Sequence, residues 1–159
     1  MKLNSIGLSA EKSETLSKEL NVLLASFQRY YQNLRGIHWN IKGKAFFDLH
    51  VKFEELYNDA NTKVDLIAER ILTLGEVPLH TFEDYIENAK VPAGKNITQD
   101  EAAIRLTVDT LKELLIIERK ILDISDEAND EGTNSMMSDF IAEQEKTVWM
   151  MKAWLTEEI

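Results

Sequence analysis

Hydrophobic residues recur every three or four positions along most of the chain, which is the spacing of amphipathic helices. A first stripe predicts an unbroken helix over about residues 9–38, and a second predicts a helix over residues 49–74. The second helix should end at Gly75, with Pro78 just beyond it, because glycine readily closes a helix and proline cannot continue one. The first half of the chain thus predicts two long helices.

Residues 76–97 hold both prolines and only a weak helical pattern. We expect a long crossover with a short helix over about residues 82–88. Thr98 and Glu101 have the spacing of a capping box, in which each side chain bonds the backbone amide of the other. This pair predicts the start of a third long helix.

The third stripe runs over residues 104–122, and a fourth covers residues 137–155 after a polar turn. Thr133 or Asn134 is the expected N-cap of the fourth helix. Four long helices with one long connection between the second and third predict an all-α, ferritin-like four-helix bundle. A length of 159 residues and a hydrophobic content of 44% fit a single domain over residues 1–159.

The composition limits the kinds of metal site and binding partner that the chain can have. The chain has no cysteine, which excludes disulfides, thiolate zinc sites and iron–sulfur ligation. Its net charge of −10 argues against a phosphate-binding surface and favours metal cations as partners. The N-terminus lacks the apolar core of a signal peptide, and no stretch is apolar enough to span a membrane. We therefore expect a cytoplasmic protein without a membrane partner.

Two pairs of metal-ligating residue types lie on the second predicted helix. His50 and Glu54 are four residues apart, as are Asp65 and Glu69, so each pair shares a helix face. The two pairs lie about 22 Å apart along the helix axis, at 1.5 Å per residue, and cannot hold one ion within one chain. A twofold dimer with antiparallel second helices would bring the early pair of one chain to the late pair of the other.

His38 precedes the break at Gly43 and could fold back beside His50. Imidazole together with carboxylates suits iron, and a partly open site suits iron oxidation. The alternative interpretation is that these residues are surface charges on an ordinary bundle. The chain has no Glu-x-x-His motif, which excludes the usual intrachain di-iron bundle, and no His-Glu-x-x-His zinc-protease motif.

The chain closely resembles the Dps family of mini-ferritins. The similarity is carried by HWNIKGKAFFDLHVKFEELY at residues 38–57, DLIAER at residues 65–70 and WMMKAWL at residues 149–155. The resemblance implies a dodecameric hollow shell that oxidises Fe(II), preferentially with hydrogen peroxide, and stores the ferric mineral. It also implies an intersubunit centre that holds up to two irons.

Carried over by position, the resemblance assigns five metal ligands. His38 and His50 would come from one subunit, Asp65 and Glu69 from its partner, and Glu54 would be an accessory ligand for a second iron. The first four would also be the catalytic residues.

The resemblance suggests further roles outside the ligand set. Trp39 could intercept oxidising equivalents, although packing at a dimer interface explains it equally well. Asp126, Asp130 and Glu131 match the acidic pore for iron uptake, and a solvated turn is the alternative. Ser135 stands where many relatives carry a further aspartate. His80, in the crossover, is expected to be a surface residue.

The family's DNA-binding members commonly use a mobile tail rich in lysine and arginine. This chain offers only Lys2 and Lys12 before the first helix and finishes with TEEI, which argues against direct DNA binding. A DNA-compacting protein remains the alternative function, and a purely structural bundle is a third hypothesis.

Overall fold

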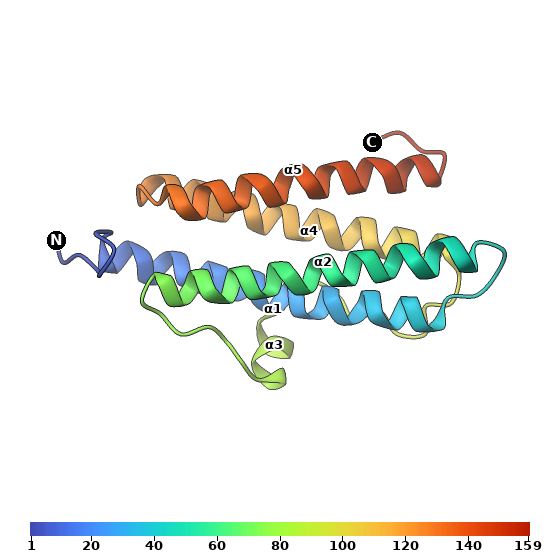
Figure 1. The fold of residues 1–159 in the computed structure, drawn as a ribbon, viewed down its shortest axis with the longest axis horizontal. Coiled ribbons are helices and arrows are strands. Elements are labelled where there is room, and N and C mark those ends of the chain that lie inside the picture. Colours follow the sequence, from blue (N-terminus) through green and yellow to red (C-terminus); the bar gives the residue numbers. More distant parts are fainter.

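The computed structural model describes all residues, 1–159, and contains only helices as regular elements. Neighbouring long helices run antiparallel, in the pairs α1 with α2 and α4 with α5 (Figure 1). No helix is both long and apolar enough to cross a membrane. The elements are α1 (Ala10–Asn40), α2 (Phe46–Thr73), α3 (Phe82–Asn88), α4 (Asp100–Glu127) and α5 (Glu131–Trp154).

The predicted all-α bundle with a long crossover is confirmed. Helix α2 ends at Thr73, and Gly75 follows with a φ of +95°, a conformation that glycine adopts without strain. The crossover is long because α2 finishes at one end of the bundle and α4 begins at the other (Figure 1). The short helix predicted over residues 82–88 is present as α3, capped by the hydroxyl of Thr81.

The capping box predicted at the start of the third long helix is wrong. The N-cap of α4 is Gln99, which makes no side-chain capping bond. The Asp100 carboxylate accepts the amide of Glu101 instead. Thr98 lies one residue too early to cap, and its carbonyl accepts the amide of Lys42 from the α1–α2 loop.

The N-cap predicted for the fourth long helix is also wrong. Helix α5 begins earlier, with Asp130 as its N-cap, and the Asp130 side chain accepts the amide of Thr133. Aspartate caps by this bond as well as threonine or asparagine does. Thr133 instead donates its hydroxyl proton to the same carboxylate.

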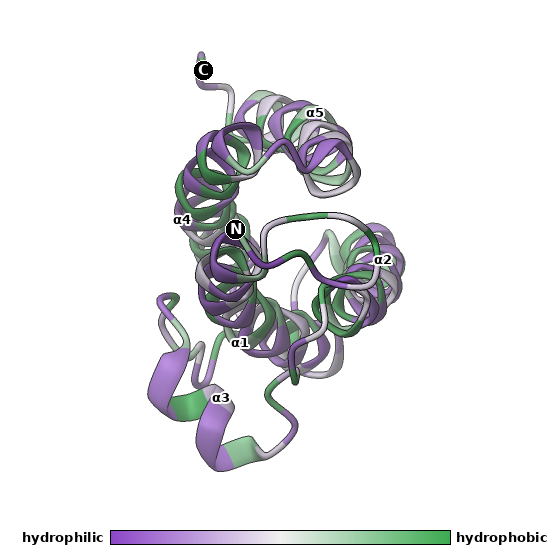
Figure 2. Ribbon diagram, turned by 90° about the vertical axis from the view of Figure 1, so that its left-hand side faces the viewer, coloured by the Kyte–Doolittle hydropathy of each residue, from purple (hydrophilic) through white to green (hydrophobic).

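The long helices surround one hydrophobic core, to which all four contribute. Helix α1 packs against α2, α3 and α4, and α4 packs against α5. The end-on view shows α2 and α5 standing apart on one side of the bundle (Figure 2). The bundle is therefore less tightly closed between α2 and α5 than along its other sides.

Candidate metal centre

His38 and His50 meet where α1 passes into α2. His38 lies near the end of α1 and His50 in the second turn of α2. Between the helices, Gly43 reverses the chain with a φ of +113°. The two imidazole rings stack with their centroids 3.8 Å apart and an interplanar angle of 11°. The expected return of His38 to the side of His50 is thus observed.

Each histidine ring is held by the backbone of the other residue. Nδ1 of His38 lies 2.6 Å from the carbonyl oxygen of His50, and Nδ1 of His50 lies 2.7 Å from the carbonyl oxygen of His38. A carbonyl oxygen only accepts, so each Nδ1 carries the proton and donates. In a neutral ring the lone pair is then on Nε2, the arrangement found in metal-bound histidines.

Aromatic side chains fix the outer faces of this histidine pair. Phe46 stacks on His50 with ring centroids 4.9 Å apart, and Tyr57 lies against His38 at 5.3 Å. His38 is buried and His50 is partly exposed. Such packing restricts ring rotation, so the two free Nε2 atoms form a preorganised pair of nitrogen donors.

The candidate carboxylates stand elsewhere on α2. Glu54, Asp65 and Glu69 are all exposed, and none has a side-chain hydrogen bond or ion pair within the chain. No group of three or more His, Asp or Glu side chains comes together within this chain in a way that could hold a metal ion. The structure therefore brings His38 and His50 together and leaves Asp65 and Glu69 apart from them.

Large hydrophobic side chains share this exposed side of α2. Phe47 is 80% exposed and Leu72 is 58% exposed, near opposite ends of the helix. Val51 lies one turn beyond Phe47 and is also exposed. Apolar groups in water around unpaired carboxylates are typical of a surface that another chain covers.

The three residues of the predicted pore lie together at the turn between α4 and α5. Asp126, Asp130 and Glu131 line a small polar depression of about 160 Å³. Asp126 and Glu131 are exposed, but Asp130 is only 2% exposed and pairs with Arg70 from α2. The pore stays a prediction, and Asp130 in addition caps α5.

Trp39 and His80 are not part of the pair formed by His38 and His50. Trp39 is 58% exposed, and the guanidinium of Arg35 lies 4.8 Å from the centre of its ring. His80 is exposed, and its Nδ1 lies 2.9 Å from the carbonyl oxygen of Pro78. Nothing brings His80 to the candidate ligands, in keeping with the expected surface residue.

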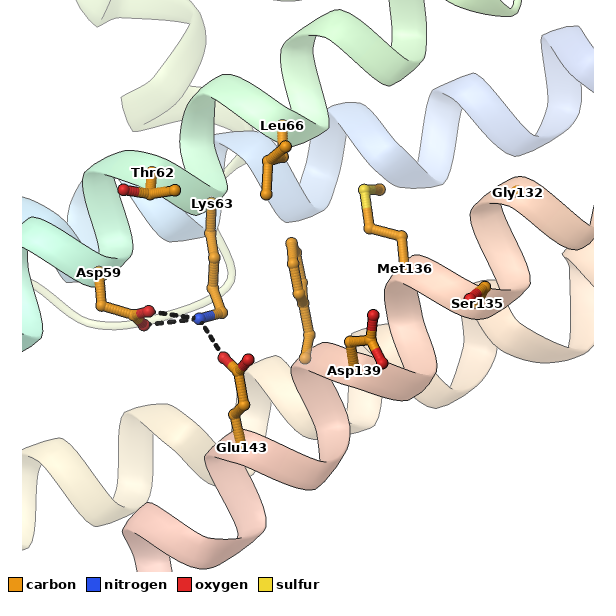
Figure 3. Close-up of a pocket in the computed structure, with 10 residues that line it drawn as sticks. Asp59, Thr62, Lys63, Leu66, Gly132, Ser135, Met136, Asp139 and Glu143 are labelled. Atoms are coloured by element: carbon orange, nitrogen blue, oxygen red, sulfur yellow. Dashed lines mark hydrogen bonds and ion pairs between the residues drawn. The ribbon is translucent and has the colours of Figure 1, made fainter.

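A cleft of about 510 Å³ separates α2 from α5 (Figure 3). Lys63 extends across it and donates to both oxygens of Asp59, at 2.7 and 2.6 Å, and to Glu143 at 2.8 Å. Arg70 makes a second bridge to α5 nearer the end of α2. Neither basic residue was singled out from the sequence, because each lies within the hydrophobic stripe of α2, and its partner on α5 is far away along the chain.

A buried polar pair also lies among the core residues. Glu118 on α4 has no exposed surface, and it accepts a hydrogen bond of 2.5 Å from Nε2 of Gln144 on α5. Burial raises the pKa of Glu118 to about 8, against the opposing effects of Gln144, Lys63 and Arg119. A glutamate in the apolar stripe between Leu115 and Leu122 was the one sequence signal for this pair.

Comparison with known proteins agrees with this architecture. Residues 17–158 match the family described as ferritin-like domain. The crystal structure of the Dps protein from Vibrio cholerae O1 has a TM-score of 0.96 and 47% identity, with 98% of each chain covered. The crystal structure of a Dps protein from Bacillus brevis has a TM-score of 0.89 and 33% identity, covering 91% of this chain and 97% of that one. The fold is thus that of a ferritin-like domain.

Sequence comparison narrows the assignment further. The DNA protection during starvation protein from Porphyromonas gingivalis is 40% identical over 155 residues, which is 98% of each chain. The chain belongs to the Dps family of mini-ferritins. This confirms the resemblance carried by residues 38–57 and 65–70. The Vibrio cholerae protein is described as a member of a broad superfamily of ferritin-like diiron-carboxylate proteins.

Proposed function

We propose that the chain is the subunit of an iron-storing mini-ferritin that oxidises Fe(II) at centres shared between two subunits. The observation that carries this proposal is the stacked histidine pair, whose two Nδ1 atoms are tied to backbone carbonyls. Two Nε2 atoms without hydrogen-bond partners, with no carboxylate beside them in the same chain, form half of a nitrogen and oxygen site.

The register of α2 supports a partner chain as the source of the other half. An antiparallel dimer with its twofold axis at the midpoint between Asp59 and Ala60 would place equidistant residues opposite each other. Ligand types and exposed apolar residues then fall into matching pairs across the axis. The pairs are Phe47 with Leu72, His50 with Glu69, and Glu54 with Asp65.

In this arrangement His38 and His50 of one subunit and Asp65 and Glu69 of its partner bind Fe(II) as the substrate. Glu54, which faces Asp65 across the axis, is the accessory ligand for a second iron. Hydrogen peroxide accepts two electrons, one from each Fe(II), and with two protons it becomes two molecules of water. Paired delivery of electrons avoids release of a hydroxyl radical, and Fe(III) then passes into a dodecameric shell for storage.

Iron taken up through acidic pores would protect the cell during starvation and oxidative stress. Asp126 and Glu131 are the exposed carboxylates available for such a pore, since rings of carboxylates attract cations. Trp39 is a candidate for intercepting stray oxidising equivalents. The net charge of −10 does not favour DNA binding, which we keep only as the alternative to be tested by gel shifts across salt concentrations.

The test of the proposed function is a comparison of oxidants. Fe(II) oxidation is followed by absorbance in metal-free protein whose assembly state has been measured by light scattering. We expect faster oxidation with hydrogen peroxide than with oxygen, two Fe(II) consumed per peroxide, and ferric iron retained in the protein. An oxidation rate equal to that in buffer alone would leave only a structural role.

A further inference from the structure

Arg70 reaches from α2 across the open side of the bundle to the first turn of α5. Its Nε donates to the hydroxyl of Thr133 at 2.9 Å, and its Nη2 donates to Asp130 at 2.5 Å. Asp130 is 2% exposed and Thr133 is fully buried. A guanidinium that bonds a buried carboxylate and a hydroxyl at once is held in direction as well as in distance.

Gly132 closes around the same guanidinium. A Cβ atom at this position would lie 2.9 Å from Nη1 of Arg70, closer than real contacts allow. Asp130 is fixed in turn, because it also caps α5 through the amide of Thr133. Arg70, Asp130 and Thr133 therefore form one rigid joint between α2 and α5, which we call the Arg70 joint.

The Arg70 joint lies directly beside a proposed metal ligand. Glu69 precedes Arg70, and α2 ends only four residues after Glu69, at Thr73. The Glu69 carboxylate has no partner within the chain, so its location depends on the backbone of the last turns of α2. Anchoring Arg70 to α5 holds those turns against fraying.

We propose that Arg70 is a positioning residue for the carboxylate half of the metal site, with Asp130 as its anchor rather than as a pore carboxylate. The proposal rests on the proposed function, because it takes Glu69 and Asp65 as ligands. It assigns to Asp130 a task different from that of Asp126 and Glu131, although all three line the same depression.

The direction in which the cation affinity changes when Arg70 is replaced distinguishes positioning from simple electrostatics. Removing the positive charge of Arg70 from beside a cation site should tighten cation binding by Coulomb's law. Loss of positioning should weaken it, because Glu69 no longer stands at the distance and angle that the metal requires. Arg70→Met is therefore expected to change affinity in opposite directions under the two interpretations.

The experiment titrates Zn²⁺, a redox-inert probe that takes nitrogen and oxygen ligands, into metal-free assembled protein by calorimetry. We expect Arg70→Met to weaken Zn²⁺ binding by about tenfold or more, as for other groups that support metal ligands without touching the metal. The Zn²⁺ affinity of Arg70→Lys should fall between those of Arg70→Met and wild type. A lysine ammonium can pair with Asp130, but it cannot make the two directed hydrogen bonds of the guanidinium. Arg70→Lys also provides a milder variant if Arg70→Met fails to assemble.

Lys63→Met is the matched control. Lys63 also crosses from α2 to α5 through a buried side chain, and it pairs with Glu143. Lys63 lies six residues before Glu69, and its buried ammonium bonds Asp59 and Glu143 and not the exposed ligand Asp65. Its loss should therefore lower the thermal midpoint and leave the Zn²⁺ affinity at the wild-type value. If Lys63→Met and Arg70→Met weaken Zn²⁺ binding equally, any loosening of α2 has the same effect on the metal site. That result would overturn the specific role of Arg70.

Asp130→Asn tests the anchor. If Asp130 anchors Arg70, Asp130→Asn should weaken Zn²⁺ binding as Arg70→Met does, whereas Asp126→Asn should not. If Asp130 is a pore carboxylate, Asp130→Asn should behave like Asp126→Asn, with slower iron uptake and unchanged Zn²⁺ affinity. The second pattern would overturn the proposal.

His50→Ala distinguishes failure of this inference from failure of the proposed function. If His50→Ala binds Zn²⁺ as wild type does, the metal site lies elsewhere and the proposed function itself is wrong. If His50→Ala loses binding while Arg70→Met binds with wild-type or higher affinity, only the positioning role is wrong. A lower thermal midpoint of Arg70→Met with unchanged Zn²⁺ affinity would show a purely structural role.

Discussion

Two groups of polar side chains lack complete partners within the chain, and they lie in opposite environments. At the surface, the carboxylates of Asp65 and Glu69 and the Nε2 atom of the partly exposed His50 have no hydrogen-bond partner. In the core, one oxygen of Glu118 and the side-chain oxygen of Gln144 have no hydrogen-bond partner. A polar atom without a hydrogen-bond partner therefore has a different physical meaning at the surface and in the core.

An exposed donor or acceptor is bonded by water, so it can stay free for a metal or a partner chain at little cost. A buried acceptor without a partner costs about 1–3 kcal/mol, and so the interior must supply one. A proton on the free oxygen of Glu118 could donate to the free oxygen of Gln144 and satisfy both atoms. The raised pKa of Glu118, about 8, agrees with a protonated side chain at neutral pH.

The largest effect is expected on the surface group. His50→Ala and Asp65→Ala should each reduce Fe(II) oxidation to the rate in buffer, because each removes a metal ligand and leaves the core intact. Stopped-flow absorbance of assembled protein would measure the initial rates. His80→Ala is the control, since it removes a surface histidine outside the site, and an unchanged rate in either ligand variant would place the centre elsewhere.

Mixing the two inactive variants tests whether the surface group is one half of a site that two chains share. A site shared by two chains can be rebuilt in a mixed dimer, where one site is intact and the other carries both lesions. Random pairing makes about half of the dimers mixed, so roughly one quarter of wild-type activity should return. Co-assembly must be verified by mass spectrometry, and absence of recovery after demonstrated exchange rules out the shared site.

Glu118→Gln should affect stability and leave iron oxidation unchanged. The folded chain keeps a proton on Glu118 between pH 4.5 and about 8, where the unfolded chain has released it, so wild-type stability falls as the pH rises through this window. A glutamine can accept from Gln144 and donate to it without titrating. Near pH 8 the variant should be more stable by a few kcal/mol, at 1.36 kcal/mol per unit of pKa shift.

Denaturant unfolding of both proteins at several pH values, at one protein concentration, would measure this difference. The curves should meet near pH 4 and separate toward pH 8. Parallel curves would show that Glu118 does not hold a proton in the folded state. A lower oxidation rate in Glu118→Gln would link the core pair to the surface site and contradict their expected independence.

The smallest effect is expected at the depression between α4 and α5. Asp126→Asn and Glu131→Gln together should slow iron uptake a few fold, because exposed carboxylates concentrate cations only in part through solvent. The rate should lose some of its dependence on ionic strength. Uptake kinetics in low and high salt would show this, and identical salt dependence in variant and wild type would remove these residues from the uptake route.

The fold was largely predictable because apolar periodicity governs the long helices. The four stripes, the ending at Gly75 and the short α3 all follow from local spacing and turn residues. The two helix starts at Gln99 and Asp130 were not predicted, since several polar residues compete for each cap. Which residue becomes the N-cap depends on contacts from other helices, such as the ion pair of Arg70 with Asp130.

The site was predictable only in its parts. Spacing identified the pairs on α2 and the distance between them, and the return of His38 followed from the glycine break. The exchange of hydrogen bonds between ring nitrogens and backbone carbonyls has no sequence pattern, because it depends on the path of residues 41–45. Glu118 and Arg70 were missed because their partners lie on helices that are distant in sequence.

The carbonyl partners of the two histidines belong to the main chain, and this has a consequence for comparing sequences. Replacing one ring leaves the other ring's hydrogen bond in place, so the side chains are separable. One residue inserted into or deleted from residues 41–45 would shift both carbonyls at once while every ligand remained in the sequence. The length of this loop is therefore as much a part of the signature of a working site as the histidines themselves.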